Sequence, residues 1–371
     1  MVKDMNKQRF INMGSIGKFS AVVKNLCYQV DYDGKDEEGN AKYSYKERPV
    51  LKAIATEKIH GTNMAVCYNA DSGFYVQSRK NIITPLQDNN GCAFVAESKK
   101  DVWMHIINAL AVEYNVNLDT HILTIYSEWC GGNIQRNSCV SGLDKRAIMF
   151  QYFKVSPLVQ DEENPEAAIW LETRTTQGSM GKVWEGNADE NIFNVMDFEY
   201  HVIEVDFNKP EVAQNSMIKL LKQNELNSPT AKAFGIDKNI LEGYVYTTMF
   251  EGQRYVWKVK GEEHSKSSGK VKTLKVIDEK EEQLKSHVAQ KVVPGWRLMQ
   301  MYQEIINSTY NGDEKLLSMK DIGIMLKLVN QDIVKEELDV LTESGFEFKH
   351  ISSYTSKIIK AWFIDKINNN F

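Results

Sequence analysis

One lysine beside a tight polar turn is the residue in this sequence best suited to covalent chemistry. Lys58 lies in the stretch TEKIHGTN, between the apolar runs 50–55 and 64–68, which is typical of a strand, a turn and a second strand. A lysine held beside other positive charge loses its proton more readily, and the neutral amine is a nucleophile. Because a lone lysine is more often a solvated surface charge, the assignment depends on what the rest of the chain supplies.

Later segments carry the charged groups that a bound nucleotide needs. Arg79, in SRK, offers a guanidinium fork suited to phosphate. Glu128 ends an apolar stretch, where it can accept hydrogen bonds from a ribose, while Glu242, followed by a glycine, suits a divalent metal. Lys258 and Lys260 stand two residues apart, so a strand would place both on one face, where a polyphosphate would relieve their repulsion.

Together these residues predict attack by Lys58 on the α-phosphorus of a nucleoside triphosphate. Charge that develops on the phosphoryl oxygens in such a reaction is stabilised by lysine, arginine and metal cations. Each segment taken alone is a weak signal, because a charged strand end or turn is usually a solvated surface.

A framework of strands and helices must position these groups. Apolar runs and turn residues predict strands at 51–57, 64–69, 74–78, 122–128, 147–155, 241–248 and 255–260. Helices are predicted at 98–115 and 212–223, a surface hairpin or loop at 31–43, and an excursion rich in turn residues at 161–191.

The character of the chain changes after residue 260. Residues 261–272 are rich in Ser, Gly and charge, as in a linker, and 275–371 have helical periodicity. A cap at Ser318 predicts one long helix that ends at 344, and another helix is expected over 354–368. We therefore expect two domains, at 1–268 and 269–371.

Composition limits the partners and the compartment. The 371 residues carry a net charge of −5, so binding to nucleic acid would rely on local basic patches. The five cysteines include no CxxC pair, which favours a reducing cytosol over a disulfide framework or a zinc ribbon. The sequence has no apolar signal core and no run of about 18 apolar residues, so we expect a cytoplasmic protein without a membrane span.

The order of the motifs KIHGTN, SRK, YSEW, FQYF, LEGYV and WKVK resembles the covalent nucleotidyltransferase superfamily of polynucleotide ligases and mRNA capping enzymes. Within it, EKIHGTN is similar to the phage-type, nick-sealing RNA ligases of the RNA ligase 2 family. The resemblance implies an α+β fold, with a nucleotidyltransferase (ATP-grasp-like ligase) domain of antiparallel sheets with helices. A small all-α C-terminal domain that engages RNA at the nick would follow.

The resemblance implies roles for the residues around the nucleotide. Lys58 would form the lysyl-AMP adduct, and Ile59 beside it would line the nucleotide site. Glu57 would recognise the adenine edge, His60 would assist the first adenylylation step, and Glu128 would hold the ribose.

It also implies roles toward the phosphates and the RNA. Glu242 would bind the catalytic metal, and Lys258 and Lys260 would contact the AMP phosphate and the leaving pyrophosphate. Asn63 would contact the ribose or the end of the nicked strand, and Arg79 would bind phosphate and the RNA terminus.

An aromatic side chain of FQYF would stack on adenine. The resemblance favours Phe153, with Phe150 as the alternative, and Lys154 stands where the family usually has an aspartate.

The implied reaction is ATP-dependent sealing of 3′-OH/5′-phosphate nicks in duplex RNA or RNA–DNA hybrids, through lysyl-AMP and AMP-polynucleotide intermediates. ATP would be the AMP donor and Mg²⁺ or Mn²⁺ the metal. We expect a monomer that acts in RNA repair, in the host cytoplasm if a bacteriophage encodes it.

Other classes of protein stay open at this point. A DNA ligase or a capping guanylyltransferase normally carries an OB-fold after the lysine pair, and the helical periodicity of the tail argues against both. A nucleic-acid-binding protein with a decayed site is a further alternative. The tail would grip the duplex through basic residues that are equally compatible with solvated helix faces, namely Lys266, Lys270, Lys272, Arg297 and Lys327.

Overall fold

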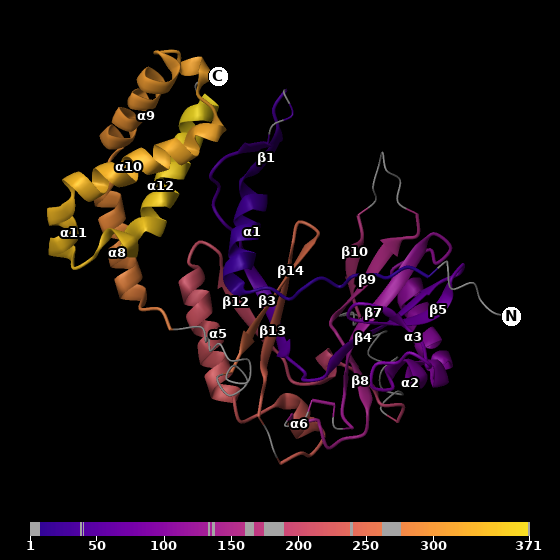
Figure 1. The fold of residues 1–371 in the computed structure, drawn as a ribbon. Helices are drawn as coiled ribbons and strands as arrows, with labels where there is room; N and C mark the ends of the chain where they lie inside the picture. Colours follow the sequence, from indigo (N-terminus) through magenta and orange to yellow (C-terminus); the bar gives the residue numbers. More distant parts are fainter. Residues whose placement is uncertain are drawn as a thin grey trace. The chain divides into compact units, whose positions relative to one another are not determined.

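A computed structural model (Figure 1) describes residues 8–369, except 38, 40, 133, 136, 137, 160–166, 174–188, 238, 239 and 262–275. The chain forms two compact units. The first consists of Met1–Val22, Leu51–Val205 and Ser216–Lys275, and the second of Val23–Val50, Asp206–Asn215 and Val276–Phe371. The division into functional domains at 1–268 and 269–371 stays a prediction.

The larger sheet of the first unit contains β4, the strand that follows the lysine turn. Its strands run β10-β9-β7-β4-β5-β6, with β8 paired to β7 and β11 paired to β8. The bounds are β4 Thr62–Asn69, β5 Gly73–Ser78, β6 Ile82–Ile83, β7 His121–Cys130, β8 Arg146–Met149, β9 Tyr152–Pro157, β10 Ile169–Glu172 and β11 Ile192–Asn194. The central pairs β4–β5 and β4–β7 are antiparallel, as expected for an α+β fold.

Two helices pack on this sheet, and only the second of them, within the predicted range 98–115, was expected. They are α2, Cys92–Ser98, and α3, Lys100–Glu113. Trp103 and Leu110 of α3 are buried with Val66 and Ile125 of the sheet in one core. Each such side chain contributes about 1.5–3 kcal/mol when it is removed from water, so this core holds β4 and β7 in place.

A second sheet of the first unit has the order β12-β3-β13-β14. Its strands are β3 Val50–Glu57, β12 His201–Asp206, β13 Gly243–Phe250 and β14 Gln253–Lys260. Side chains alternate along β14, where Trp257 is fully buried and stacks on Tyr246 of β13 with ring centroids 5.5 Å apart. Lys258 and Lys260 therefore share the opposite face of the strand, which confirms the spacing argument.

The predicted strand 147–155 is wrong as a single element. It divides into β8 and β9, which pair with different parts of β7, and the register shifts by two residues between Ser127↔Met149 and Thr124↔Lys154. The residues left between them are Phe150 and Gln151. An apolar run has no period that marks such a break, because the break is set by pairing with β7.

The second unit has its own core, formed by helices. The long elements are α8 Glu279–Val292, α9 Gly295–Tyr310, α10 Ile322–Glu336, α11 Leu338–Ser344 and α12 Phe348–Asn369. Leu298, Ile305, Val329 and Phe363 are among the side chains buried there. Short 3₁₀ turns lie at Glu314–Leu316 and Met319–Asp321, and the first unit has another at Val195–Asp197.

The predicted helix from 318 to 344 is interrupted. Ser318 does cap the chain, with a capping box to Asp321, but α10 and α11 are separate helices on either side of Glu337. The Arg297 guanidinium lies 2.6 Å from the Glu337 carboxylate and 2.6 Å from that of Asp332. Arg297 is 2% exposed, so its predicted contact with RNA is wrong, whereas Lys327 is exposed. Lys266, Lys270 and Lys272 lie outside the described residues.

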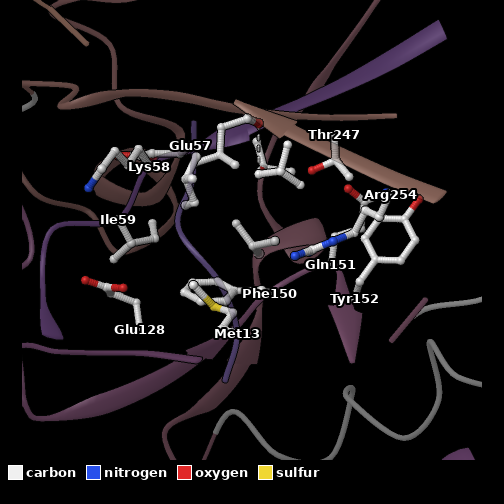
Figure 2. A pocket seen from close by; sticks show the side chains of 15 residues that line it. Met13, Glu57, Lys58, Ile59, Glu128, Phe150, Gln151, Tyr152, Thr247 and Arg254 are labelled. Carbon is white, nitrogen blue, oxygen red and sulfur yellow. Dashed lines mark hydrogen bonds between the residues drawn. The ribbon is translucent and has the colours of Figure 1, made fainter. Parts of the chain in front are cut away.

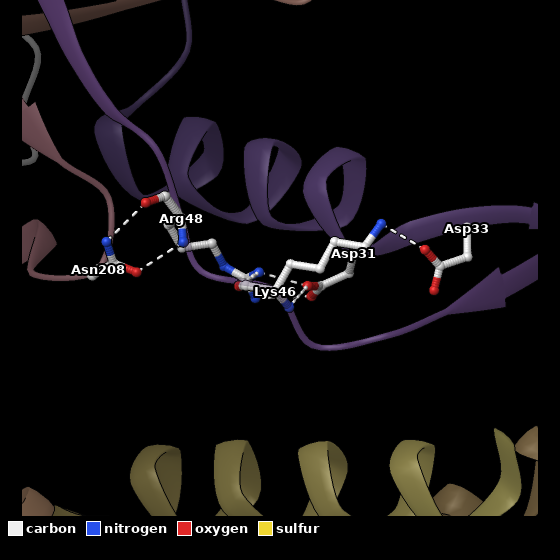
Figure 3. A network of polar contacts seen from close by, with 5 residues as sticks. All are labelled: Asp31, Asp33, Lys46, Arg48 and Asn208. Carbon is white, nitrogen blue, oxygen red and sulfur yellow. Dashed lines mark hydrogen bonds and ion pairs between the residues drawn. The ribbon is translucent and has the colours of Figure 1, made fainter. Parts of the chain in front are cut away.

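The N-terminal part contains a helix that the sequence pattern did not predict. It is α1, Phe19–Asp31, and the hairpin β1 Tyr32–Lys35 and β2 Ala41–Tyr43 follows it. Figure 3 shows the polar contacts that close this region: Arg48 donates to the Asp31 carboxylate at 2.8 Å and exchanges hydrogen bonds with Asn208. Lys46 pairs with Asp33 at 2.5 Å. The predicted surface hairpin at 31–43 is therefore confirmed.

Two further helices in the described part of the chain are α5, Pro210–Asn224, and the short α6, Pro229–Ala233. The predicted excursion at 161–191 and the linker at 261–272 fall largely outside the described residues. Within the described ranges, every helix is too short or too polar to cross a membrane.

Candidate active site

The turn that carries Lys58 is held by its two neighbouring sheets. The Lys58 N–H donates to the carbonyl of Gly243 at 2.8 Å, and the Gly61 N–H donates to the Glu128 carboxylate at 3.0 Å. A Cβ at Gly61 would lie 2.4 Å from the carbonyl oxygen of Trp129, so only glycine fits where β4 meets β7. The lysine therefore has a fixed position between the sheets.

Glu242, immediately before β13, is the centre of a cluster of cations. Its Oε1 lies 2.8 Å from the Nζ of Lys58 and 2.8 Å from the Nζ of Lys260, and its Oε2 lies 2.7 Å from Nδ1 of His60. Burial raises the pKa of Glu242, but the hydrogen bond from His60 and the charges of Lys58 and Lys260 outweigh burial. The net pKa lies well below its usual range, so the carboxylate is ionised at neutral pH.

The glycine after Glu242 allows a close approach between two strands. Gly243 has φ of 150°, and a Cβ there would lie 2.1 Å from the carbonyl oxygen of Val259. This close approach between β13 and β14 brings Glu242 next to Lys260, rather than keeping a path open to a ligand.

Lys258 adds positive charge to the same face of β14. Burial lowers its pKa, as do the nearby charges of Lys260, Lys58 and Arg79. Cations gathered in this way repel one another unless an anion lies among them, so the cluster is suited to bind phosphate groups.

Glu128 lies opposite Asn63 across the β4–β7 pair. Burial raises its pKa to about 7, although the charge of Lys58 and the Gly61 N–H favour the ionised form. This carboxylate therefore titrates near neutrality.

A pocket lies beside Lys58 (Figure 2). In the view of Figure 2, Lys58 and Glu128 lie at one end, Arg254 and Tyr152 at the other, and Phe150 between them. The lining residues are Met13, Ile16, Thr56, Glu57, Lys58, Ile59, Glu128, Phe150, Gln151, Tyr152, Val195, Val245, Thr247, Arg254 and Val256.

The two aromatic candidates are separated by the break between β8 and β9. Phe153 is fully buried in the core and contacts Tyr114 of α3 edge to face, with ring centroids 5.5 Å apart. Its choice as the stacking residue is therefore corrected, because its ring packs on α3. Phe150, the alternative, lines the pocket.

Glu57 contributes to the pocket wall, but its carboxylate is engaged elsewhere. One oxygen accepts from the hydroxyl of Ser228 at 2.6 Å, and the other accepts from the backbone N–H of Thr230 at 2.8 Å. Burial raises the pKa of this carboxyl, which is 4% exposed. These two hydrogen bonds anchor the start of α6, and the contact of Glu57 with the adenine edge stays a prediction. Ile59 also lines the pocket, and its role toward the nucleotide stays a prediction.

Asn63 and Arg79 lie outside the lining of this pocket. Asn63 is partly buried, and its Nδ2 lies 3.6 Å from Sδ of Met13. Arg79 is exposed and lines a separate, shallow groove with Lys80 and Asn89. The structure therefore brings together Lys58, His60, Glu242 and Lys260, and leaves Arg79 at the rim.

Several pocket residues were missed from the sequence, among them Gln151, Tyr152 and Arg254. The position of Arg254 could have been predicted from the sequence, because Arg254, Val256 and Lys258 are two residues apart and share one face of a strand. Gln151 had none, because its position depends on the break in pairing with β7.

The protein side chains at this site could bind a divalent metal only if the substrate supplied further ligands. Within the described ranges, no group of three or more His, Cys, Asp and Glu side chains is arranged to hold a metal. Mg²⁺ commonly takes one or two carboxylates and completes its shell with phosphate oxygens and water, so the ionised Glu242 is a suitable single ligand.

The fold and the lysine-centred pocket together define a nucleotidyltransferase-like α+β protein. Residues 51–260 match the family model described as RNA ligase, which is more than half of the chain. The chain belongs to the RNA ligase family of the nucleotidyltransferase superfamily. No curated protein matches it.

Solved structures of Naegleria gruberi RNA ligase are similar to this chain. The form with ATP and manganese is 15% identical, with a TM-score of 0.38, over 68% of this chain and 57% of the other. The form with pyrophosphate is 16% identical, with a TM-score of 0.39, over 71% and 59%. This chain thus spans less than three fifths of the length of these structures.

Proposed function

We propose that the protein is an ATP-dependent RNA ligase that seals 3′-OH/5′-phosphate nicks in duplex RNA or RNA-containing hybrids. The observation that carries the proposal is the contact of Lys58 with Glu242 at 2.8 Å, at one end of a pocket that Phe150 also lines. Membership of the RNA ligase family supports it. The more specific nick-sealing assignment comes from the EKIHGTN stretch.

In the first step, the neutral amine of Lys58 attacks the α-phosphorus of ATP. Lys58, an ammonium beside Glu242, gives one proton to solvent before the attack and a second as the N–P bond forms and the P–O bond to pyrophosphate breaks. Lys258 and Lys260 bind the phosphates, and His60 and Lys260 hold the carboxylate of Glu242 that orients Lys58. Positioning and charge stabilisation of this kind are the main devices of phosphoryl-transfer catalysis.

Glu242 would hold a divalent metal together with the triphosphate, which is anionic enough to bind between the surrounding ammonium groups. When bound, such an ion supplies positive charge for the phosphoryl oxygens. Phe150 would stack on the base, and Glu128 would accept hydrogen bonds from the ribose.

The later steps require RNA. AMP passes from Lys58 to the 5′-phosphate of the nick, and the 3′-OH then attacks that phosphate and releases AMP. Arg79, in its open groove, and Asn63 are positioned outside the nucleotide pocket and would contact the RNA end. Residues 1–268 would carry out adenylyl transfer, and 269–371 would engage the duplex, so a chain that ends near 265 should adenylylate but not seal.

Labelled ATP tests the proposal directly. Incubation with Mg²⁺ should give an acid-stable protein adduct that Lys58→Ala abolishes. Lys52→Ala, an exposed lysine on the same strand, is the matched control and should label normally. The absence of an adduct from the wild-type protein would refute the proposal, and labelling by GTP alone would indicate a capping-type activity.

A panel of nicked duplexes then separates RNA joining from DNA joining. RNA and DNA are varied on each side of the nick and on the template strand. Sealing that requires RNA at the 3′-OH side supports an RNA ligase, whereas efficient sealing of all-DNA nicks alone would indicate a DNA ligase.

A further inference from the structure

The end of the pocket away from Lys58 holds two polar groups that the reaction at phosphorus does not use. They are the side-chain amide of Gln151 and the guanidinium of Arg254, both in the pocket lining. Figure 2 shows the guanidinium pointing into the pocket toward Gln151 and Phe150. If the triphosphate lies at Lys58 and the base on Phe150, this end meets the edge of the base.

Gln151 is held rigidly and presents one acceptor. Its backbone carbonyl accepts from the N–H of Thr173 at 2.7 Å, and its Nε2 donates to the Glu172 carboxylate at 3.4 Å. Because Nε2 faces a carboxylate, Oε1 is the atom left over, and it is buried without a hydrogen-bond partner among the described residues. Buried acceptors are rarely left unpaired, so a ligand donor is the simplest partner for it.

Among the residues that the structure describes, Arg254 is held by aromatic rings and not by a carboxylate. Its guanidinium carbon lies 3.6 Å from the ring centroid of Trp170 and 5.9 Å from that of Tyr152. Burial lowers its pKa to about 10, and the acidic groups that oppose this effect are the phenols of Tyr152 and Tyr126. A guanidinium fixed by stacking keeps its N–H donors available for a ligand.

We propose that Gln151 and Arg254 read the base edge of the nucleotide and select adenine, with Gln151 Oε1 accepting from the exocyclic amino group and Arg254 donating to an adjacent ring nitrogen. Adenine presents this combination of an amino donor next to a nitrogen acceptor, and glutamine is a common partner of that edge. Guanine places a carbonyl oxygen where adenine has the amino group, so two acceptors would face each other at Gln151. This inference rests on the proposed function of the same pocket.

Arg254 alone would make the opposite choice. An isolated arginine is best matched to guanine, whose O6 and N7 both accept. The buried acceptor of Gln151 is therefore the group that decides between the bases. Arg254 contributes affinity for both, because N7 accepts a hydrogen bond in adenine and in guanine.

The test compares ATP with GTP and with purine riboside triphosphate, which is ATP without the amino group. Adduct formation by the wild-type protein should favour ATP over the analogue by about 10-fold or more, the effect of one buried hydrogen bond, and should disfavour GTP further. Gln151→Met should lower the rate with ATP to that with the analogue and leave the analogue unchanged. Arg254→Met should lower the rate with ATP and the rate with the analogue by a similar factor.

Tyr152→Phe is the matched control in the same wall. Its hydroxyl donates at 2.9 Å to the same Glu172 oxygen that Gln151 Nε2 approaches, but it makes no proposed contact with the base, so the preference for ATP over the analogue should persist. Equal rates with ATP and the analogue in the wild-type protein, an unchanged ratio in Gln151→Met, or a preference for GTP would each overturn the inference. The ratio of the wild-type rates with ATP and with the analogue tests the inference even if Gln151→Met does not fold.

Equilibrium binding separates this inference from the proposed function. Calorimetric titration of ATP and the analogue into Lys58→Met measures base preference without covalent chemistry. A wild-type protein that forms no adduct refutes the ligase proposal, while a preference for ATP that disappears in the Lys58→Met, Gln151→Met double variant still supports base reading. An adduct with ATP but no preference between the two nucleotides refutes the base reading alone.

Discussion

The Nζ of Lys58 lies 2.8 Å from Oε1 of Glu242, and the Nζ of Lys260 lies at the same distance from the same oxygen. One carboxylate thus holds two ammonium groups that would otherwise repel each other. A nucleotide phosphate that enters the site can take over part of this role, because it offers several anionic oxygens to the same cations.

Removal of the charge on Glu242 tests this relationship. Glu242→Gln keeps the shape of the side chain but leaves Lys58 and Lys260 without their shared counter-ion. We expect adduct formation with ATP to fall by about 100-fold or more, the usual effect of losing one preorganised polar group. Glu251→Gln, in the exposed turn between β13 and β14, is the control and should retain adduct formation. Similar rates for both variants would contradict the role of Glu242.

The raised pKa of Glu128 predicts a pH dependence of stability. With a pKa of about 7 in the folded protein, above its ordinary value of 4.5, Glu128 binds more protons folded than unfolded between those values. The free energy of unfolding should therefore decrease as pH rises through this window, by about 3 kcal/mol at most for this group. Urea unfolding at pH 5 and pH 8 measures the effect. Glu128→Gln should remove this part of the dependence, and an identical pH profile in the variant would argue against the assignment.

The two phenylalanines of FQYF should respond differently to truncation. Phe150→Ala should weaken ATP binding about 10-fold or more by loss of stacking, with little change in stability. Phe153→Ala should lower the free energy of unfolding by about 3–5 kcal/mol, because it leaves a cavity against Tyr114. Calorimetric binding and thermal unfolding of both variants check this. A loss of ATP affinity confined to Phe153→Ala would reverse the assignment.

Arg79 and Asn63 should act after the first step. Arg79→Ala and Asn63→Ala should form the lysyl adduct at close to the wild-type rate but seal a pre-adenylylated nick about 10-fold or more slowly, by loss of hydrogen bonds to a charged RNA end. Arg79→Lys keeps the charge without the guanidinium fork and should lie in between. Single-turnover sealing of pre-adenylylated RNA is the measurement, and equal loss of both steps would contradict a role confined to RNA.

Arg297 should be a stability determinant of the helical unit. Arg297→Met leaves the carboxylates of Asp332 and Glu337 without their buried partner, so we expect a loss of about 3 kcal/mol in the free energy of unfolding. Lys327→Ala, on the exposed face of α10, should stay within about 0.5 kcal/mol of the wild type. A denaturation midpoint unchanged by Arg297→Met would indicate that the carboxylates find other partners.

Strand and helix patterns were predictable where burial alternates along a single element. β3, β4, β5, β7, β13 and β14 lie close to the predicted ranges, as do α3 and α5. The two unpredicted breaks, at Phe150 and at Glu337, share one physical cause. Each depends on a contact with an element that is distant in the sequence. The break at Phe150 depends on pairing with β7, and the break at Glu337 coincides with the ion pair to Arg297 of α9.

The sequence by itself determined which reactive groups the chain contains and the order in which they occur, because motif order and strand alternation are local properties. Only the tertiary structure decided which groups meet. His60 and Glu242 are separated by 182 residues and are in contact, whereas Phe153, three residues from Phe150, faces the core. Contacts of this range follow from the pairing of β3 with β13 and of β7 with β8 and β9, which no local pattern specifies.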